Sequence, residues 1–324
     1  MSIFGDATIR LDPWQPEFGA EAPGMGKAAE DDPSTVVIDV ECGADAWKPI
    51  VPEAATVPPR LVFVDGVRRV EARIVGRRGD KRFLGAFGSW GVGAVAVKQG
   101  AAEFLAQQIG RNIALGSGET FDDMIAVSAA LRYVPVSTAD ETADGPVFAL
   151  HEQMRLAEER MATELADDPD TLVIGDGPLT FEHPVRGAAV GYVKRILQLY
   201  LPESHYGILT SLPSGARTPL FALAGRFARY AWFVRLAAPR RGDAETSGLV
   251  RMEVAQGVGV DRARALADAC TSIAPGFASI RGLHTRAPQN LLPIGALEVW
   301  LRRQLGDVNV VHRQIQTYVA AGAP

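Results

Sequence analysis

The segment from about residue 147 to residue 176 constrains the fold more than any other part of the sequence. Between Val147 and Ala166, apolar residues recur at helical spacing and form one stripe, at Leu150, Met154, Ala157, Met161 and Leu165. The run Asp167-Asp168-Pro169-Asp170 ends this helix, and the short apolar strand LVIGD follows directly and stops at Asp176. A helix that leads straight into a buried strand predicts a layered α/β domain.

The sequence upstream of this helix predicts strands that pair with their neighbours. After the proline-rich boundary Val57-Pro58-Pro59 comes a buried strand, Leu61–Val64, which we expect to turn tightly at Asp65-Gly66 and return from Arg69 to Val75. The following segment, FLGAFGSWGVGAVAV, predicts one or two further strands. This order favours an α/β fold with a ribonuclease-H-like mixed sheet flanked by helices, although periodicity alone does not distinguish it from other α/β sheets.

The domain organisation follows from changes in composition. Residues 1–57 are rich in Pro, Gly, Ala and acids, and we interpret them as a short acidic N-terminal extension or small subdomain. Residues 58–324 are expected to form one domain. Within it, residues 100–113 and 121–132 have helical periodicity, so we expect a helical insertion at about 100–135.

Composition excludes several classes of protein. The sequence is 47% hydrophobic and 22% charged, which is typical of a folded protein, and no apolar run approaches the roughly 18 residues that cross a bilayer. We therefore expect a cytoplasmic protein with no membrane segment. Cys42 and Cys270 are far apart and encode neither a disulfide framework nor a zinc site.

Charge gives a mixed indication about nucleic acid. The net charge of -5 argues against indiscriminate binding to a polyanion. Residues 217–241, however, contain several arginines and no acid, interleaved with aromatic residues. This stretch is interpreted either as a groove for a nucleic-acid backbone or as solvated arginines that flank a buried aromatic strand.

Two aspartates share one sequence context and are the best candidates for chemistry. Asp65 in VFVDG and Asp176 in VIGDG each follow a short apolar strand and precede glycine. Carboxylates at the ends of neighbouring strands meet at the rim of a sheet, where two of them can hold Mg²⁺ or Mn²⁺. Asp-Gly also simply makes turns, and for two matched contexts the two interpretations have about equal weight.

Helical geometry selects a third acid. At about 100° per residue, Glu158 lies roughly 70° from the centre of the apolar stripe, whereas Glu152 and Glu159 lie nearly opposite it. Glu158 is therefore the candidate, although a register error of one position would exchange it with Glu159. Glu298 borders a later apolar stripe, where glutamates are most often boundary residues. Lys194 follows the apolar GYV and is either a contact for a scissile phosphate or a surface lysine at a strand end.

These segments together resemble the NurA nuclease family over roughly residues 58–315. The matching motifs are FVDG (63–66), RxxE (155–158), IGDGPL (174–179), GYVK (191–194), WFVRL (232–236) and VRMEV (250–254). The resemblance implies a ribonuclease-H-like, homodimeric nuclease domain that depends on Mn²⁺ (or Mg²⁺). Such nucleases act on DNA ends and single strands in double-strand break repair, beside a HerA-type hexameric ATPase.

Carried over to this chain, the resemblance implies that Asp65, Glu158 and Asp176 bind the metal, with Lys194 nearby. The family commonly has a Tyr-Pro pair and then an Ala-His pair near the C-terminus, whereas this chain reads PQNLLPIGALE. This alignment puts Asn290 near the tyrosine and Leu297-Glu298 near the Ala-His pair. Glu298 then replaces the histidine as an oxygen ligand, or the site is weakened; His284 is a further alternative. A catalytically weak or inactive adaptor for a HerA-type ATPase or repair complex is therefore the second hypothesis.

Overall fold

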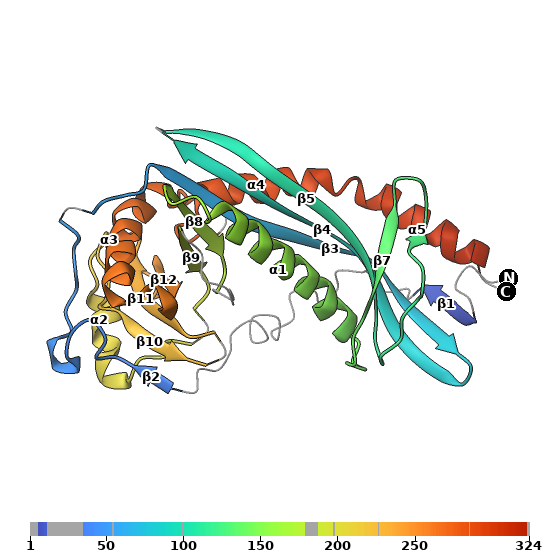
Figure 1. Ribbon diagram of the computed structural model, residues 1–324, viewed down its shortest axis with the longest axis horizontal. Coiled ribbons are helices and arrows are strands. Elements are labelled where there is room, and N and C mark those ends of the chain that lie inside the picture. Colours follow the sequence, from blue (N-terminus) through green and yellow to red (C-terminus); the bar gives the residue numbers. More distant parts are fainter. Residues whose placement is uncertain are drawn as a thin grey trace.

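The fold is built on one mixed, mostly antiparallel sheet (Figure 1). The structure is a computed structural model that describes residues 6–11, 35–53, 55–98, 100–178, 187–196, 198–225, 227–284 and 286–322. Within these ranges the sheet contains 12 strands: β1 (Ala7–Leu11), β2 (Thr35–Val37), β3 (Arg60–Arg78), β4 (Lys81–Lys98), β5 (Ala101–Leu115), β6 (Ile125–Ala126), β7 (Arg132–Ser137), β8 (Thr171–Asp176), β9 (Ala188–Val193), β10 (Phe221–Ala224), β11 (Arg229–Arg235) and β12 (Leu249–Ala255).

The helices of the described ranges are α1 (Gly145–Leu165), α2 (Tyr206–Ser211), α3 (Val260–Phe277), α4 (Leu292–Gln304) and α5 (Val308–Gly322). The predicted mixed α/β class is thus confirmed. None of these helices combines the length and the apolar character that a bilayer crossing requires.

The centre of the sheet has the strand order β5-β4-β3-β8-β9. Strands β3, β4 and β5 form an antiparallel meander, while β8 runs parallel to β3 and β9 runs parallel to β8. The chain passes from β7 to β8 through α1, which is the crossover that a parallel neighbour of β3 requires. Strands β1 and β2, from the first 57 residues, pair with β3 and β10 in the same sheet.

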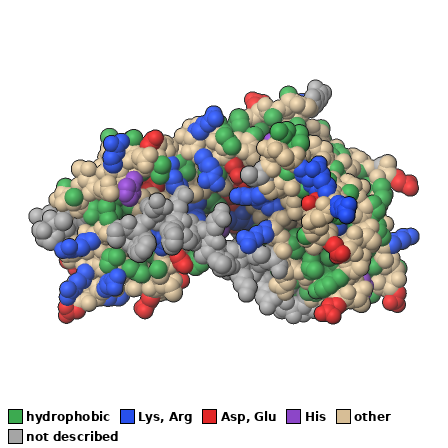
Figure 2. Space-filling model, turned by 180° about the vertical axis from the view of Figure 1, so that it is seen from behind, with side chains coloured by type: hydrophobic (Ala, Val, Ile, Leu, Met, Phe, Trp, Pro, Cys, Tyr) green, Lys and Arg blue, Asp and Glu red, His purple; other side chains and the backbone are tan. Residues whose placement is uncertain are grey.

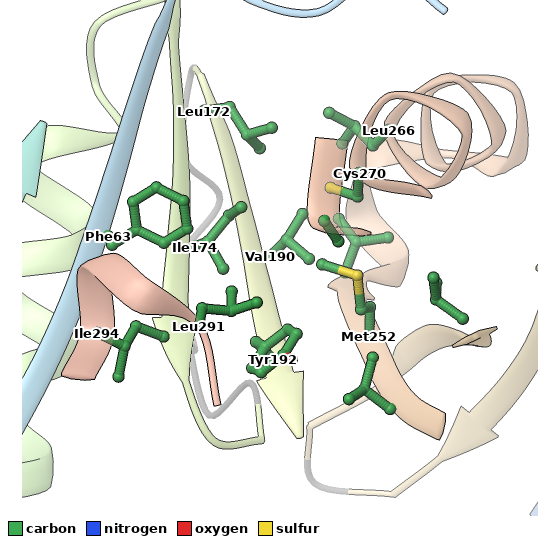
Figure 3. Packing of buried hydrophobic residues seen from close by; sticks show 14 of the residues in the cluster. Phe63, Leu172, Ile174, Val190, Tyr192, Met252, Leu266, Cys270, Leu291 and Ile294 are labelled. Carbon is green, nitrogen blue, oxygen red and sulfur yellow. The ribbon is translucent and has the colours of Figure 1, made fainter. Parts of the chain in front are cut away.

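Helices cover both faces of the central strands, with α1 on one face and α4 and α5 along the other (Figure 1). Side chains alternate between the faces of a strand. Accordingly, Val62 and Val64 of β3 belong to one apolar cluster with Met154 of α1, whereas Phe63 packs in another with Ile294 of α4. Figure 3 shows this second cluster continuing towards α3 through Ile174, Val190, Tyr192, Met252, Leu266 and Cys270.

The expected helical insertion at about 100–135 is wrong, because most of this stretch is strand. Residues 101–115 form β5, which pairs with β4 from Ala101 to Leu115, and β6 and β7 follow. Spacing alone does not separate a helix from a strand whose outer part is exposed and polar, as β5 is. Pairing with β4 decides the outcome, because strand preference depends on neighbours more than on the residue itself.

The expected turn at Asp65-Gly66 is also wrong. Strand β3 continues without interruption to Arg78, and the chain turns only at Gly79-Asp80, where Gly79 has φ 58°. Asp65 instead pairs with Gly93 in the interior of the β3–β4 ladder.

A buried ionic network joins β3 to the junction between α4 and α5. The carboxylate of Glu71, at an irregularity in the β3–β4 register, accepts hydrogen bonds from Arg69 (2.9 Å), Ser89 (2.6 Å) and the Tyr133 hydroxyl, and Arg111 lies 3.4 Å away. The Arg69 guanidinium also donates to the Gly306 carbonyl at 2.7 Å, and Arg69 and Arg111 donate to the Leu305 carbonyl at 3.0 and 3.3 Å. The C-terminal end of α4 is therefore fixed to the sheet through Glu71.

We expect Glu71→Gln to lower the free energy of unfolding by about 3 kcal/mol, because removing one charge of a buried ion pair leaves its partners uncompensated. Thermal unfolding followed by circular dichroism measures the change. Glu103→Gln, on the exposed part of β5, is the matched control and should leave the unfolding midpoint near that of the wild type. Equal midpoints for the two variants would show that the network contributes nothing to stability.

Candidate metal centre

The candidate site lies where β3 and β8 separate. The two strands are parallel, and their pairing ends with Val64 opposite Gly175. The next residues are Asp65, in the interior of the longer strand, and Asp176, the last residue of the shorter one. Parallel pairing therefore brings the two aspartates together, although only Asp176 lies at a strand end.

Three acids converge closely enough to share one cation. Ligand oxygens of Asp65, Asp176 and Glu298 all lie within 4.8 Å of one another. Asp65 is 4% exposed, and one oxygen each of Asp65 (Oδ2) and Asp176 (Oδ1) is buried with no hydrogen-bond partner in the described part of the chain. Buried acceptors are costly when left unpaired, and an all-oxygen set suits Mg²⁺ or Mn²⁺. The residues present therefore fit a hard divalent cation.

Electrostatics gives the same indication. Burial, together with the carboxylates of Asp176 and Glu158, raises the pKa of Asp65 well above its usual range, and Lys194 opposes this effect. Charged acids at such close range in a poorly solvated place repel one another. The cluster thus favours binding of a positive charge.

Lys194 places a positive charge directly against these acids. Its Nζ lies 2.8 Å from Asp176 Oδ2 and 3.4 Å from Glu298 Oε1, and it donates to Asn290 Oδ1 at 3.3 Å. Burial lowers the pKa of Lys194, but the carboxylates of Asp176 and Asp65 outweigh burial and raise it overall. The lysine therefore lies inside the acid cluster, and the sequence pattern gave no indication of Asn290 as its third partner.

Glu158, on α1, lies beside these three acids but is not one of the group within 4.8 Å. It is buried, whereas Glu159 is half-buried and Glu152 is exposed. Glycine at position 66 makes room for it, since a Cβ there would overlap Oε1 of Glu158. Burial raises the pKa of Glu158 to about 7, with Arg155 opposing and Asp176 contributing to the increase.

Arg155 connects the helix to the strand that carries Asp176. Its guanidinium donates to Glu158 Oε2 at 2.6 Å, to the Asp176 carbonyl at 2.9 Å and to the Pro178 carbonyl at 3.0 Å. The sequence shows Arg155 and Glu158 one helical turn apart, a spacing at which side chains meet, but it does not show the two carbonyls. Arg155 therefore fixes the distance between two acid-bearing elements.

An open cavity of about 390 Å³ gives access to the acids. Its lining includes Asp65, Glu158, Asp176, Lys194 and Glu298, surrounded by arginines at positions 68, 155, 195, 286 and 302. Figure 2 shows Lys and Arg side chains gathered near the middle of one face, with acidic side chains among them. His284 does not line this cavity; its side chain is exposed and contacts Ile280 instead.

Within the described residues of the arginine-rich stretch 217–241, three arginines point into the protein and not towards a surface groove. Arg217, Arg229 and Arg235 are all buried. Arg217 pairs with Glu41 and Asp268, and Arg229 pairs with Glu253. Arg226 lies outside the described residues. The aromatic residues of β11 belong to the core, as the alternative interpretation expected. The three arginines, however, are not solvated: they form internal ion pairs or hydrogen bonds, which the charge pattern alone does not reveal.

We expect Lys194→Met to lower the free energy of unfolding of the metal-free protein by roughly 3 kcal/mol, because the neighbouring carboxylates lose their counter-charge. Addition of Mn²⁺ should raise the unfolding midpoint of the variant more than that of the wild type. Thermal unfolding with and without metal measures both effects. Lys81→Met removes an exposed lysine from its ion pair with Glu119 and should cost less than about 1 kcal/mol; a similar loss in both variants would contradict the assigned role.

Gly66→Ala should displace the Glu158 side chain and cost roughly 1 kcal/mol, because the added methyl group overlaps a carboxylate end that can move only by leaving Arg155. In the double variant Gly66→Ala/Glu158→Asp, the shorter acid should remove part of this cost. A double-mutant cycle of unfolding free energies measures the coupling. Gly175→Ala is the control, since a Cβ there meets nothing within 4 Å; zero coupling would rule out the contact.

Comparison with known proteins finds similarity among solved structures only. No protein-family model matches this sequence, and no curated protein matches it. Among solved structures, the crystal structure of the NurA nuclease from Sulfolobus solfataricus is 12% identical and aligns over 84% of this chain and 88% of that chain, with a TM-score of 0.44. The assignment of the site therefore depends on its geometry.

Proposed function

We propose that this protein is a metal-dependent nuclease that hydrolyses phosphodiester bonds of DNA. The observation that carries the proposal is the convergence of Asp65, Asp176 and Glu298 at the separation of β3 and β8, with Glu158 beside them. Carboxylates from separate strands and helices, open to a cavity rimmed by arginines, suit a polyanionic substrate and a cation. The order β5-β4-β3-β8-β9 also supports a ribonuclease-H-like core.

In this proposal Asp65, Asp176 and Glu298 hold Mn²⁺ or Mg²⁺, with Glu158 completing the set. When bound, the ion supplies an acidified water and charge stabilisation at the phosphodiester. Arg155 keeps Glu158 and the Asp176 backbone at a fixed separation. The Lys194 ammonium, which pairs with Asp176 and Glu298 in the structure, would turn to the phosphate of the substrate and neutralise one of its oxygens.

The resemblance adds finer predictions to this proposal. They are action on DNA ends and single strands in double-strand break repair, a preference for Mn²⁺, a homodimer and a HerA-type hexameric ATPase as partner. Light scattering of the purified protein tests the homodimer. Co-purification with a HerA-type ATPase tests the partner.

The second candidate function is an inactive adaptor that keeps the fold and binds a HerA-type ATPase or repair complex. The position of Lys194 favours it, because an ammonium 2.8 Å from Asp176 already compensates part of the acid charge. Calorimetric titration separates the two functions. Binding of Mn²⁺ that Asp176→Asn abolishes supports the nuclease, whereas no binding at millimolar Mn²⁺ supports the adaptor.

We expect purified protein to degrade single-stranded and blunt linear DNA when Mn²⁺ is present and to stop when EDTA is added. Asp65→Asn and Asp176→Asn should each lower the rate about 100-fold or more, because removing residues that only orient metal ligands already costs 10 to 100-fold. Labelled DNA resolved on denaturing gels measures the rate.

Controls come from the same elements. Asp170→Asn, at an exposed position just before β8, and Glu152→Gln, on the exposed face of α1, should retain wild-type rates, while Glu158→Gln should not. Wild-type rates for Asp65→Asn and Asp176→Asn would overturn the assignment of the site. Rates that survive EDTA would overturn the metal dependence.

A further inference from the structure

Three arginines near the acid cluster have no acidic partner among the residues that the structure describes. Arg195, Arg286 and Arg302 all line the cavity, and all three are exposed. No ion pair or side-chain hydrogen bond of these residues occurs within the described ranges, and their guanidinium groups are thus available to an external anion.

Other arginines around this part of the sheet are already engaged. Arg155 is bound to Glu158, and Arg69 is bound to Glu71 and the end of α4. Arg302 lies one helical turn beyond Glu298, a spacing that normally favours an ion pair between them. Glu298 pairs with Lys194 instead, and Arg302 is exposed with no ion pair to any described residue.

The three arginines come from different elements that meet at one lysine. Arg195 directly follows Lys194, Arg302 is on α4 with Glu298, and the carbonyl of Arg286 accepts a hydrogen bond from the backbone N–H of Asn290 at 3.2 Å. Lys194 contacts both Glu298 and Asn290. These contacts hold the backbones that carry the three guanidinium groups around the same opening.

Two other basic groups of the cavity, Lys194 and His151, add little free positive charge. Lys194 is neutralised by Asp176 and Glu298. Burial, together with Arg68 and Arg155, lowers the pKa of His151 to about 4, so its imidazole is neutral at pH 7. Arg195, Arg286 and Arg302 therefore contribute much of the positive charge at the opening of the cavity.

We propose that Arg195, Arg286 and Arg302 bind successive backbone phosphates of a single-stranded polynucleotide and lead it to the acid cluster. A small lone anion is a poor fit, because the acids in the same cavity repel it. A polyanion fits better, because its charges are spread along a chain and several of its phosphates can lie on the arginines, away from the acids. Each guanidinium group can bind two phosphate oxygens at once. This assignment rests on the proposed function.

The depth of the acids favours a single strand over a duplex. Asp65 and Glu158 are 4% and 7% exposed, so the reacting phosphate must enter the cavity. A duplex is stiff over many base pairs, whereas a single strand bends freely and follows a positively charged groove.

The test is the salt dependence of binding by the triple variant Arg195→Ala/Arg286→Ala/Arg302→Ala. A fluorescent oligothymidylate is titrated with full-length protein in EDTA at several NaCl concentrations, and anisotropy gives the binding constant. Each phosphate contact contributes about 0.7 to the slope of log K against log salt for a single strand. The slope is negative, and its magnitude should therefore be smaller in the triple variant than in the wild type by roughly 2.

The matched control is Arg132→Ala/Arg240→Ala/Arg241→Ala, which removes the same charge from exposed positions that do not line the cavity. It should keep the wild-type slope, and both triple variants should unfold at the wild-type midpoint. An unchanged slope for the cavity variant, or an equal change for the control, would overturn the proposal. Equal affinity and an equal change of slope for a hairpin duplex would overturn the preference for a single strand.

Failure of this proposal is distinguishable from failure of the nuclease assignment. Binding is measured in EDTA, so a protein that never cleaves DNA can still show the change of slope. Conversely, Mn²⁺-dependent cleavage that Asp176→Asn abolishes, together with an unchanged slope in the cavity variant, would retain the nuclease and reject the arginine assignment.

Discussion

Repulsion among buried carboxylates is the constraint on which the candidate site depends. Asp65 and Asp176 become neighbours because β3 and β8 are parallel and stop pairing just before them. Glu298 and Glu158 approach the same point from opposite faces of the sheet, on α4 and α1. Such a cluster is stable only with a counter-charge, and the structure provides one in Lys194. Binding of a cation and the position of this lysine are therefore linked.

The sheet resists this repulsion through contacts on both of its faces. On one face, Arg155 ties α1 to the end of β8. On the other, Arg69 and Arg111 donate to the carbonyl of Leu305, directly after α4, and both arginines pair with Glu71. Each acid-bearing helix is thus attached to the strands by a guanidinium group, which binds several oxygens at once in a fixed geometry.

The sequence predicted the α/β class, α1 and the end of β8, because helical periodicity and a short apolar strand are local signals. It failed at Asp65-Gly66 and at residues 100–135. Asp-Gly has the composition of a turn, but pairing with β4 carries β3 straight through it. In β5 much of the strand lies on the surface, so side-chain alternation gives a weak signal. Both errors have one cause: long-range pairing overrides local preference.

The candidate acids were predictable for a different reason. Asp65 and Asp176 stand out by their matched context, and Glu158 by its angle on a helix. Asn290 and the carbonyl groups bound by Arg155 have no such pattern, since their positions depend on how distant segments meet. The burial of Arg217, Arg229 and Arg235 was equally hidden, because their partners lie far away in the sequence or on an adjacent strand.

Strand β3 runs without a break from the candidate site to the N-terminal strand β1. From Asp65 the strand continues to Arg78, where it pairs with β1. At about 3.3 Å per residue this part of the strand extends about 40 Å. Strands β4 and β5 pair alongside it, with a register irregularity at Glu71 part of the way along. One continuous strand therefore carries the candidate site and also pairs with the N-terminal strand β1, so the two regions are joined through a single backbone.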